Sequence, residues 1–190
     1  MAEYIGNYVG IDYSMSSPAI VTCPKDKEFK FQNCACFYLT DKKKLLERLH
    51  PNVIGAPHKE YIFNEKRFDY ISNWAMQLIS VRDTIVMEGY AMAAKGTVFH
   101  IGELTGVLKH KMFRKQIMFD IVPPTTIKKF ATGKGNANKD AMYAAFVAET
   151  GVDLMEFFPS KVLSSPVSDI VDAFYMCKYS HHKDMGMLPK

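Results

Sequence analysis

One carboxylate at the end of a strand-forming run near the start of the chain limits what this sequence can fold into. Residues 8–14 read Tyr-Val-Gly-Ile-Asp-Tyr-Ser and lead into a polar turn before Pro18. Valine, isoleucine and tyrosine favour a buried strand, whereas aspartate is unfavourable in one. Burial of a carboxylate is costly unless a cation or several hydrogen-bond donors meet it. Asp12 is therefore predicted to bind a cation or, alternatively, to end the strand and hydrogen-bond the turn behind it.

A second carboxylate ends another apolar run. Residues 84–88 read Thr-Ile-Val-Met-Glu, so Glu88 repeats the arrangement at Asp12. In open α/β sheets, side chains at the carboxyl ends of neighbouring strands point into one crevice, which is where such proteins place their sites. We therefore predict that Asp12 and Glu88 lie together.

Two more acids are expected on the last helix. Ser168 is the predicted N-cap of a helix that extends to about residue 180, with Asp169 in its first turn. Asp169 and Asp172 are three residues apart, so they share one helix face, and the residues beside them are apolar. Two like charges on a partly buried face repel each other unless a divalent cation is bound.

These four acids predict a metal site. Carboxylates without clustered histidine or cysteine are typical of a hard cation, Mg²⁺ or Mn²⁺, rather than zinc. Enzymes of phosphoryl transfer commonly hold two such ions, one to activate water and one to stabilise the leaving oxygen. The predicted ligands of two ions are Asp12, Glu88, Asp169 and Asp172.

The rest of the pattern predicts one α/β domain over residues 1–190. Further strands are predicted over residues 18–22, 29–39 and 116–122, the first of them in an antiparallel hairpin with residues 8–12. Helices are predicted over residues 64–80, 97–115 and 139–150, the last ended by Gly151. Residues 40–57 predict only a short helix, and residues 152–168 are predicted to be irregular.

Basic residues are concentrated in one part of the sequence. The net charge is only +4, but residues 109–139 contain eight lysines and arginines and a single acid, Asp120. Such a basic stripe is expected of a protein that binds a phosphate backbone, although a solvated helix face would also account for it. The predicted DNA-binding residues in this stripe are Lys109, Lys111, Arg114, Lys115, Lys129 and Lys134.

Two segments resemble the RuvC family of Holliday-junction resolvases. Residues 124–139, Pro-Thr-Thr-Ile-Lys-Lys-Phe-Ala-Thr-Gly-Lys-Gly-Asn-Ala-Asn-Lys, resemble the family's segment before its last acidic helix. Residues 168–173, Ser-Asp-Ile-Val-Asp-Ala, look like the D-x-x-D-A helix that closes the family's site. The acids at residues 12 and 88 fall in the family's order at similar spacing, so the resemblance covers nearly the full chain.

The resemblance implies a ribonuclease H-like α/β fold, with a mixed five-stranded sheet flanked by helices, in a protein that acts as a homodimer. It implies that the four acids bind metal and that Lys128 and Lys139 match the family's two functionally important lysines. The implied activity is metal-dependent hydrolysis of branched DNA, in which four-way junctions are resolved by paired symmetric nicks.

Departures from the family pattern are also present. The first acid is followed by Tyr13 and Ser14, where the family usually has Pro-Gly. Bacterial members often place a base-stacking aromatic residue three positions after the second acid, where this chain has Ala91. Tyr90 is the candidate for that stacking role, with an ordinary loop or dimer contact as the alternative. The departures suggest a divergent member, carried by a phage.

Other classes of protein are less consistent with the sequence. No apolar run approaches the ~18 to 20 residues of a membrane-spanning helix and no signal peptide is evident, so a soluble, cytoplasmic protein is expected. The four cysteines are too few for a disulfide framework and are predicted to be reduced. Two alternatives remain open: a nuclease for flaps or RNA–DNA hybrids on the same fold, and a catalytically weak junction-binding module. A pure binding module has no need for four acids.

Overall fold

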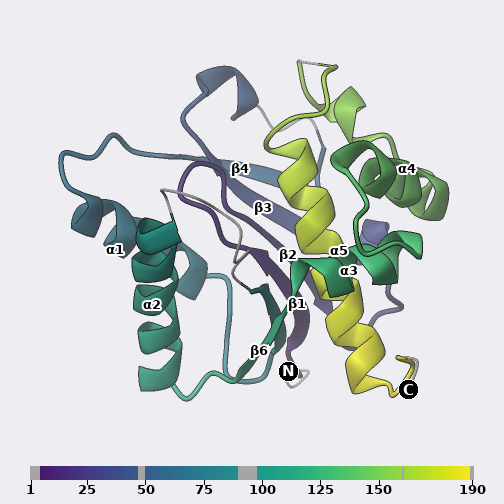
Figure 1. The fold of residues 1–190 in the computed structure, drawn as a ribbon, viewed down its shortest axis with the longest axis horizontal. Helices are drawn as coiled ribbons and strands as arrows, with labels where there is room; N and C mark the ends of the chain where they lie inside the picture. The colour runs from purple at the N-terminus through teal and green to yellow at the C-terminus, as the bar shows by residue number, and fades with distance from the viewer. Residues whose placement is uncertain (1–4, 47–49, 90–97, 160, 189–190) are drawn as a thin grey trace.

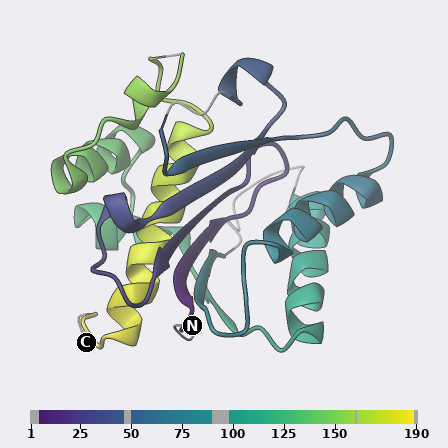
Figure 2. The same cartoon turned by 180° about the vertical axis from the view of Figure 1, so that it is seen from behind.

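Strands β1 to β6 form one mixed sheet in the order β4-β3-β2-β1-β5-β6, with helices on both faces (Figures 1 and 2). The computed structural model describes residues 5–46, 50–89, 98–159 and 161–188. The strands are β1 Asn7–Asp12, β2 Ala19–Pro24, β3 Ala35–Thr40, β4 Val53–Pro57, β5 Thr84–Glu88 and β6 Phe119–Val122. The predicted mixed sheet flanked by helices is confirmed, and so is the hairpin of β1 and β2. The prediction of five strands was wrong, because the described residues form a sheet of six.

β4 is the strand that the sequence pattern did not reveal. It pairs in parallel with β3 and forms one edge of the sheet. Its residues include Gly55 and Pro57, which are poor strand formers, but an edge strand tolerates proline because its outer side makes no ladder hydrogen bonds. Glycine is needed at position 55, since a Cβ there would lie 2.6 Å from the hydroxyl oxygen of Tyr38. Packing against β3 therefore overrides the weak local preference.

The helices form two layers. α1 (Asn64–Met76) and α2 (Val98–Arg114) pack on one face of the sheet, and the other face is covered by α3 (Pro124–Thr132), α4 (Lys139–Thr150) and α5 (Val167–Asp184) (Figures 1 and 2). Alternate side chains of the central strands serve the two cores, because successive residues of a strand point to opposite faces. Val9 and Ile11 belong to the α1–α2 core, whereas Val21 packs with Phe146 and Phe174 on the other face.

α5 crosses the centre of the sheet in direct contact with β1. The Cys177 thiol donates to the carbonyl oxygen of Tyr8 at 3.1 Å. A Cβ on Gly10 would lie 2.0 Å from the carbonyl oxygen of Ala173 and 2.3 Å from the backbone nitrogen of Cys177, so only glycine permits this approach. β1 and α5 therefore run in opposite directions: Tyr8 contacts Cys177, and Gly10, further along β1, also contacts Ala173, earlier in α5. The next step along β1 places Asp12 beside the first turn of α5.

Local details differ from the sequence predictions at several element ends. α5 begins one residue before Ser168, and its N-cap, Pro166, makes no side-chain capping bond, so the predicted capping role of Ser168 was wrong. The predicted strand over residues 29–39 is shorter, because a 3₁₀ turn occupies Phe31–Asn33. Gly151 ends α4 in the left-handed conformation with φ of 68°, as predicted. All four cysteines are free and buried, as expected of reduced thiols. None of the helices in the described residues is long and apolar enough to cross a membrane.

Candidate functional site

The carboxyl ends of β1 and β5 bring Asp12 and Glu88 to the same edge of the sheet. The two strands pair in parallel, and Ile11 lies opposite Met87, so the acids occupy the next position on each strand. The first two turns of α5 carry Asp169 and Asp172 to this edge, because α5 runs antiparallel to β1 in close contact with it. Four acids that are distant in the sequence therefore come together.

Electrostatic coupling between the acids is strong. Burial, and then the negative charges of Asp169, Asp172 and Glu88, raise the pKa of Asp12 well above its usual value. Burial and the charges of Glu88 and Asp169 raise the pKa of Asp172 to about 7. The pKa of Glu88 is also raised, mainly by burial. Such a group of acids is destabilised when all of its members are ionised, and a positive charge would relieve it.

Lys128 and Lys139 supply positive charge beside the acids. α3 begins directly after β6, whose last residue pairs with Glu88, and Lys128 lies on the second turn of this helix. Its charge acts against the raised pKa of Glu88 and of Asp172. Lys139 is the first residue of α4, and its charge acts in the same direction on Asp12 and Asp172. The fold thus brings both predicted lysines to the acidic edge.

Ser168 connects Lys139 to Asp169 through two hydrogen bonds. The Lys139 ammonium donates to Ser168 Oγ at 3.2 Å, and the hydroxyl donates to Asp169 Oδ1 at 3.1 Å. The other carboxylate oxygen, Asp169 Oδ2, is buried without a hydrogen-bond partner. The sequence pattern predicts only a capping role for Ser168, and its place directly before Asp169 is the signal of a site role.

The basic stripe of the sequence is divided between two ends of the sheet. Lys128 and the exposed Lys129 lie on α3, and Lys134 is exposed in the loop that follows it. The charge of Lys128 acts on the pKa of Glu88 and of Asp172. α2 runs from the acidic edge towards the start of β6, so its last residues lie at the opposite edge of the sheet (Figure 1). A helix of 17 residues is about 25 Å long. The basic residues in the second half of α2 and directly after it are Lys109, Lys111, Arg114 and Lys115.

Lys111 has a clear structural role. Its ammonium donates to Asp69 Oδ1 at 2.7 Å, to Ser72 Oγ at 2.8 Å and to Asn73 Oδ1 at 2.6 Å, all on α1. These bonds join α2 to α1. Lys111 therefore holds the two helices together. The charge pattern of the sequence does not reveal this role. Tyr90, the candidate for base stacking, lies outside the described residues.

The fit of the acidic group to a divalent metal depends on its donor atoms and on their arrangement. Within the described residues, no three histidine, cysteine, aspartate or glutamate side chains are arranged closely enough to hold a metal ion. The chemistry of the group nevertheless suits a hard cation, because every donor is a carboxylate oxygen. A bound cation would give Asp169 Oδ2 a partner and would lower the raised pKa values of Asp12 and Asp172. The donor atoms of these residues, though not their arrangement in this structure, are therefore those of a site for Mg²⁺ or Mn²⁺.

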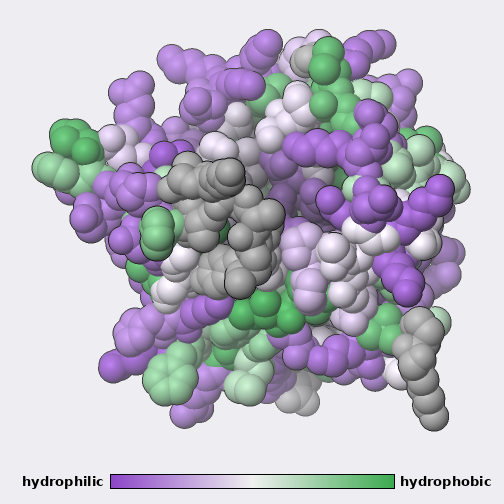
Figure 3. Space-filling model, viewed as in Figure 1, coloured by the Kyte–Doolittle hydropathy of each residue, from purple (hydrophilic) through white to green (hydrophobic). Residues whose placement is uncertain are grey.

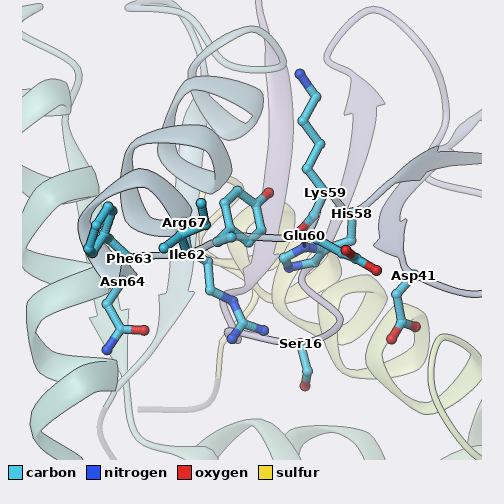
Figure 4. Close-up of a pocket in the computed structure, with 10 residues that line it drawn as sticks. Ser16, Asp41, His58, Lys59, Glu60, Ile62, Phe63, Asn64 and Arg67 are labelled. Atoms are coloured by element: carbon cyan, nitrogen blue, oxygen red, sulfur yellow. Dashed lines mark hydrogen bonds between the residues drawn. The ribbon is translucent and has the colours of Figure 1, made fainter.

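A pocket of about 430 Å³ lies behind the turn that follows Asp12 (Figure 4). Ser16, His58 and Arg67 line it, and Arg67 donates to the carbonyl oxygen of Met15 from Nε and Nη2 at 3.0 and 2.6 Å. His58 Nε2 lies 2.9 Å from the same oxygen. These contacts hold the turn in place. The hydrogen bonds to Met15 come from side chains other than Asp12.

The pH dependence of stability should report on the acids. Asp172 has a pKa of about 7 in the folded chain and an ordinary value of 3.8, so between these limits the folded state holds a proton that the unfolded state lacks. The free energy of unfolding should therefore fall as the pH rises from about 4 to about 7. Mg²⁺ should restore stability at pH 8 by a few degrees of Tm and have little effect at pH 5. Thermal unfolding with Mg²⁺ and with EDTA measures this, and the same pH dependence in Asp172→Asn would contradict it.

Comparison with known proteins supports the fold. No protein-family model matches the sequence, and no curated protein matches it. The RuvC structure of Thermus thermophilus is 14% identical and has a TM-score of 0.56, with 94% of this chain and 96% of that chain covered. T. thermophilus RuvC in complex with a Holliday junction substrate is 12% identical, with a TM-score of 0.60 and coverage of 96% and 97%. The chain therefore has a ribonuclease H-like α/β fold similar to that of RuvC.

Proposed function

We propose that this protein is a metal-dependent, structure-selective DNA endonuclease that resolves four-way junctions by paired symmetric nicks. The observation that carries the proposal is the convergence of Asp12, Glu88, Asp169 and Asp172 at one edge of a RuvC-like fold, with Lys128 and Lys139 beside them. A neighbour in fold was solved with a Holliday junction substrate, which supports branched DNA as the substrate here.

The chain's own residues account for most of the required chemistry. The four acids would hold two Mg²⁺ or Mn²⁺ ions, which when bound supply an activated water and stabilise the leaving oxygen. Lys128 and Lys139 place positive charge where negative charge develops on the phosphate during hydrolysis. Hydrolysis in this way leaves a 5′-phosphate and a 3′-hydroxyl. The acids and lysines thus have separate tasks.

A homodimer fits paired nicking, because two copies related by a twofold axis present two sites to a symmetric junction. Exposed apolar side chains offer a surface for the second copy. Phe113, near the end of α2, is 75% exposed, Met118, in the link to β6, is 80% exposed, and Ile121, within β6, is 45% exposed. Figure 3 shows hydrophobic side chains gathered around the lower ends of these elements. Patches of this kind often mark contacts with another chain.

The proposed function is tested with labelled four-way junction, flap, duplex and RNA–DNA hybrid substrates, each with Mg²⁺ and with EDTA. Nicks at symmetric positions of the junction, and only with Mg²⁺, are expected. Preferential cleavage of flaps or hybrids would instead support a different nuclease on the same fold. Tight junction binding without any cleavage would identify a binding module.

The affinity for junction DNA should fall steeply with salt, because lysines that contact phosphates release counterions. The slope of log affinity against log salt concentration should decrease by about 1 in Lys134→Ala. Lys115→Ala is a charge-matched control at the opposite edge of the sheet and should leave the slope unchanged. Fluorescence anisotropy at several salt concentrations gives the slopes. A flat salt response of the wild type would contradict the role of the basic residues.

A further inference from the structure

A continuous chain of hydrogen bonds runs from α4 to α5 through one buried hydroxyl. Lys139 Nζ lies 3.2 Å from Ser168 Oγ, which lies 3.1 Å from Asp169 Oδ1. An ammonium group only donates and an ionised carboxylate only accepts, so the hydroxyl must accept from Lys139 and donate to Asp169. Ser168 is 4% exposed, so water has little access to replace either bond.

The hydroxyl engages one oxygen of Asp169 and leaves the other unengaged. Asp169 is 8% exposed, and its Oδ2 is buried with no hydrogen-bond partner. A buried carboxylate oxygen without a donor is unfavourable, so a conformation that maintains it requires support from neighbouring bonds. The bond from Ser168 gives this support, because it restricts rotation of the carboxylate about its last side-chain bond.

We propose that Ser168 is a positioning residue of the site: its hydroxyl sets the orientation of the Asp169 carboxylate and holds the Lys139 ammonium beside it. The proposal rests on the nuclease function proposed above. Groups that hydrogen-bond to metal-binding side chains orient those side chains, and their removal typically lowers metal affinity or activity by about 10- to 100-fold. Capping of α5 does not explain Ser168, since the helix starts before it and Pro166 is the N-cap.

Ser168→Ala tests this role, with Ser180→Ala as the matched control. Ser180 lies on the same helix, is fully buried and donates to the carbonyl oxygen of Cys177 at 2.8 Å, far from the acids. Calorimetry with Mn²⁺ should show an affinity lower by about 10-fold or more in Ser168→Ala and unchanged in Ser180→Ala. In Mg²⁺, kcat on junction DNA should fall by a similar factor while KM stays constant.

Two further variants separate positioning from folding. Ser168→Thr keeps the hydroxyl and should recover most of the Mn²⁺ affinity. In a Lys139→Ala background, the effect of Ser168→Ala on kcat should shrink, because the two residues act through one chain of bonds. Wild-type Mn²⁺ affinity and kcat in Ser168→Ala would overturn the positioning role. A wild type that binds Mn²⁺ but cleaves no DNA would overturn the nuclease function alone, and the affinity comparison would still decide the role of Ser168.

Discussion

Asparagine in place of Asp12 or Asp172 should abolish cleavage of branched DNA while the protein still binds it. Each substitution keeps the side-chain shape and removes one of the coupled charges that would hold the metal ions. We expect kcat to fall by at least about 10³-fold, the upper range for loss of one charge-stabilising group. Junction affinity should stay the same or rise, because a negative charge near the phosphates is removed. Single-turnover cleavage and gel shifts in Mg²⁺ measure the two quantities.

Loss of folding can be separated from loss of chemistry in these variants. Asp12→Asn should be at least as stable as the wild type at pH 8 without metal, because the repulsion among ionised acids is reduced. Asp120→Asn is a suitable control, since Asp120 pairs with Lys183 at 2.7 Å on the surface and lies outside the acidic group. Undiminished nicking by both Asp12→Asn and Asp172→Asn would show that the site is elsewhere.

Lys139→Ala and Lys128→Ala should lower turnover more than affinity. Both ammonium groups lie close enough to the acids to oppose their raised pKa values, so they are placed to neutralise charge at the reacting phosphate. Loss of one such group should lower kcat by about 10²-fold and change junction affinity by less than about 10-fold. Cleavage rates at saturating protein, together with binding curves in Ca²⁺, separate the two effects.

Lys129→Ala is the matched control for the lysines. Lys129 follows Lys128 on α3, but its side chain is exposed, and the lysines whose charges act on the raised pKa values of Glu88 and Asp172 are Lys128 and Lys139. Its loss should weaken binding slightly and leave kcat unchanged. If Lys128→Ala and Lys139→Ala reduced affinity alone, these lysines would be contacts to the DNA backbone without a part in the reaction.

Several features of the fold follow from local sequence. β1 and β5 are recognisable because each is a short apolar run that ends on an acid, and α4 because its apolar period ends at Gly151. Asp12 and Glu88 could be placed together because neighbouring parallel strands end at the same edge of a sheet. In these segments the local preference and the tertiary environment agree, so the pattern predicts the structure correctly.

Other features depend on contacts that the local pattern does not contain. β4 includes a glycine and a proline, and its pairing with β3 and the close approach of Gly55 to Tyr38 are tertiary contacts. The basic stripe is continuous in the sequence, yet the course of α2 carries Arg114 and Lys115 away from Lys128 and Lys139. Lys111, which the charge pattern predicted to bind DNA, donates hydrogen bonds to side chains of α1.

The sequence by itself determined the kinds of residue available: strand-end and helix acids and two spaced lysines, in an order that resembles the RuvC family. Only the tertiary structure decided which of them meet. Gly10 allows the backbone of α5 to contact β1, and this contact, between residues far apart in the chain, sets Asp169 and Asp172 beside Asp12. The same packing makes Ser168 a link between Lys139 and Asp169. Such long-range contacts depend on the packing of whole elements, and no local pattern records them.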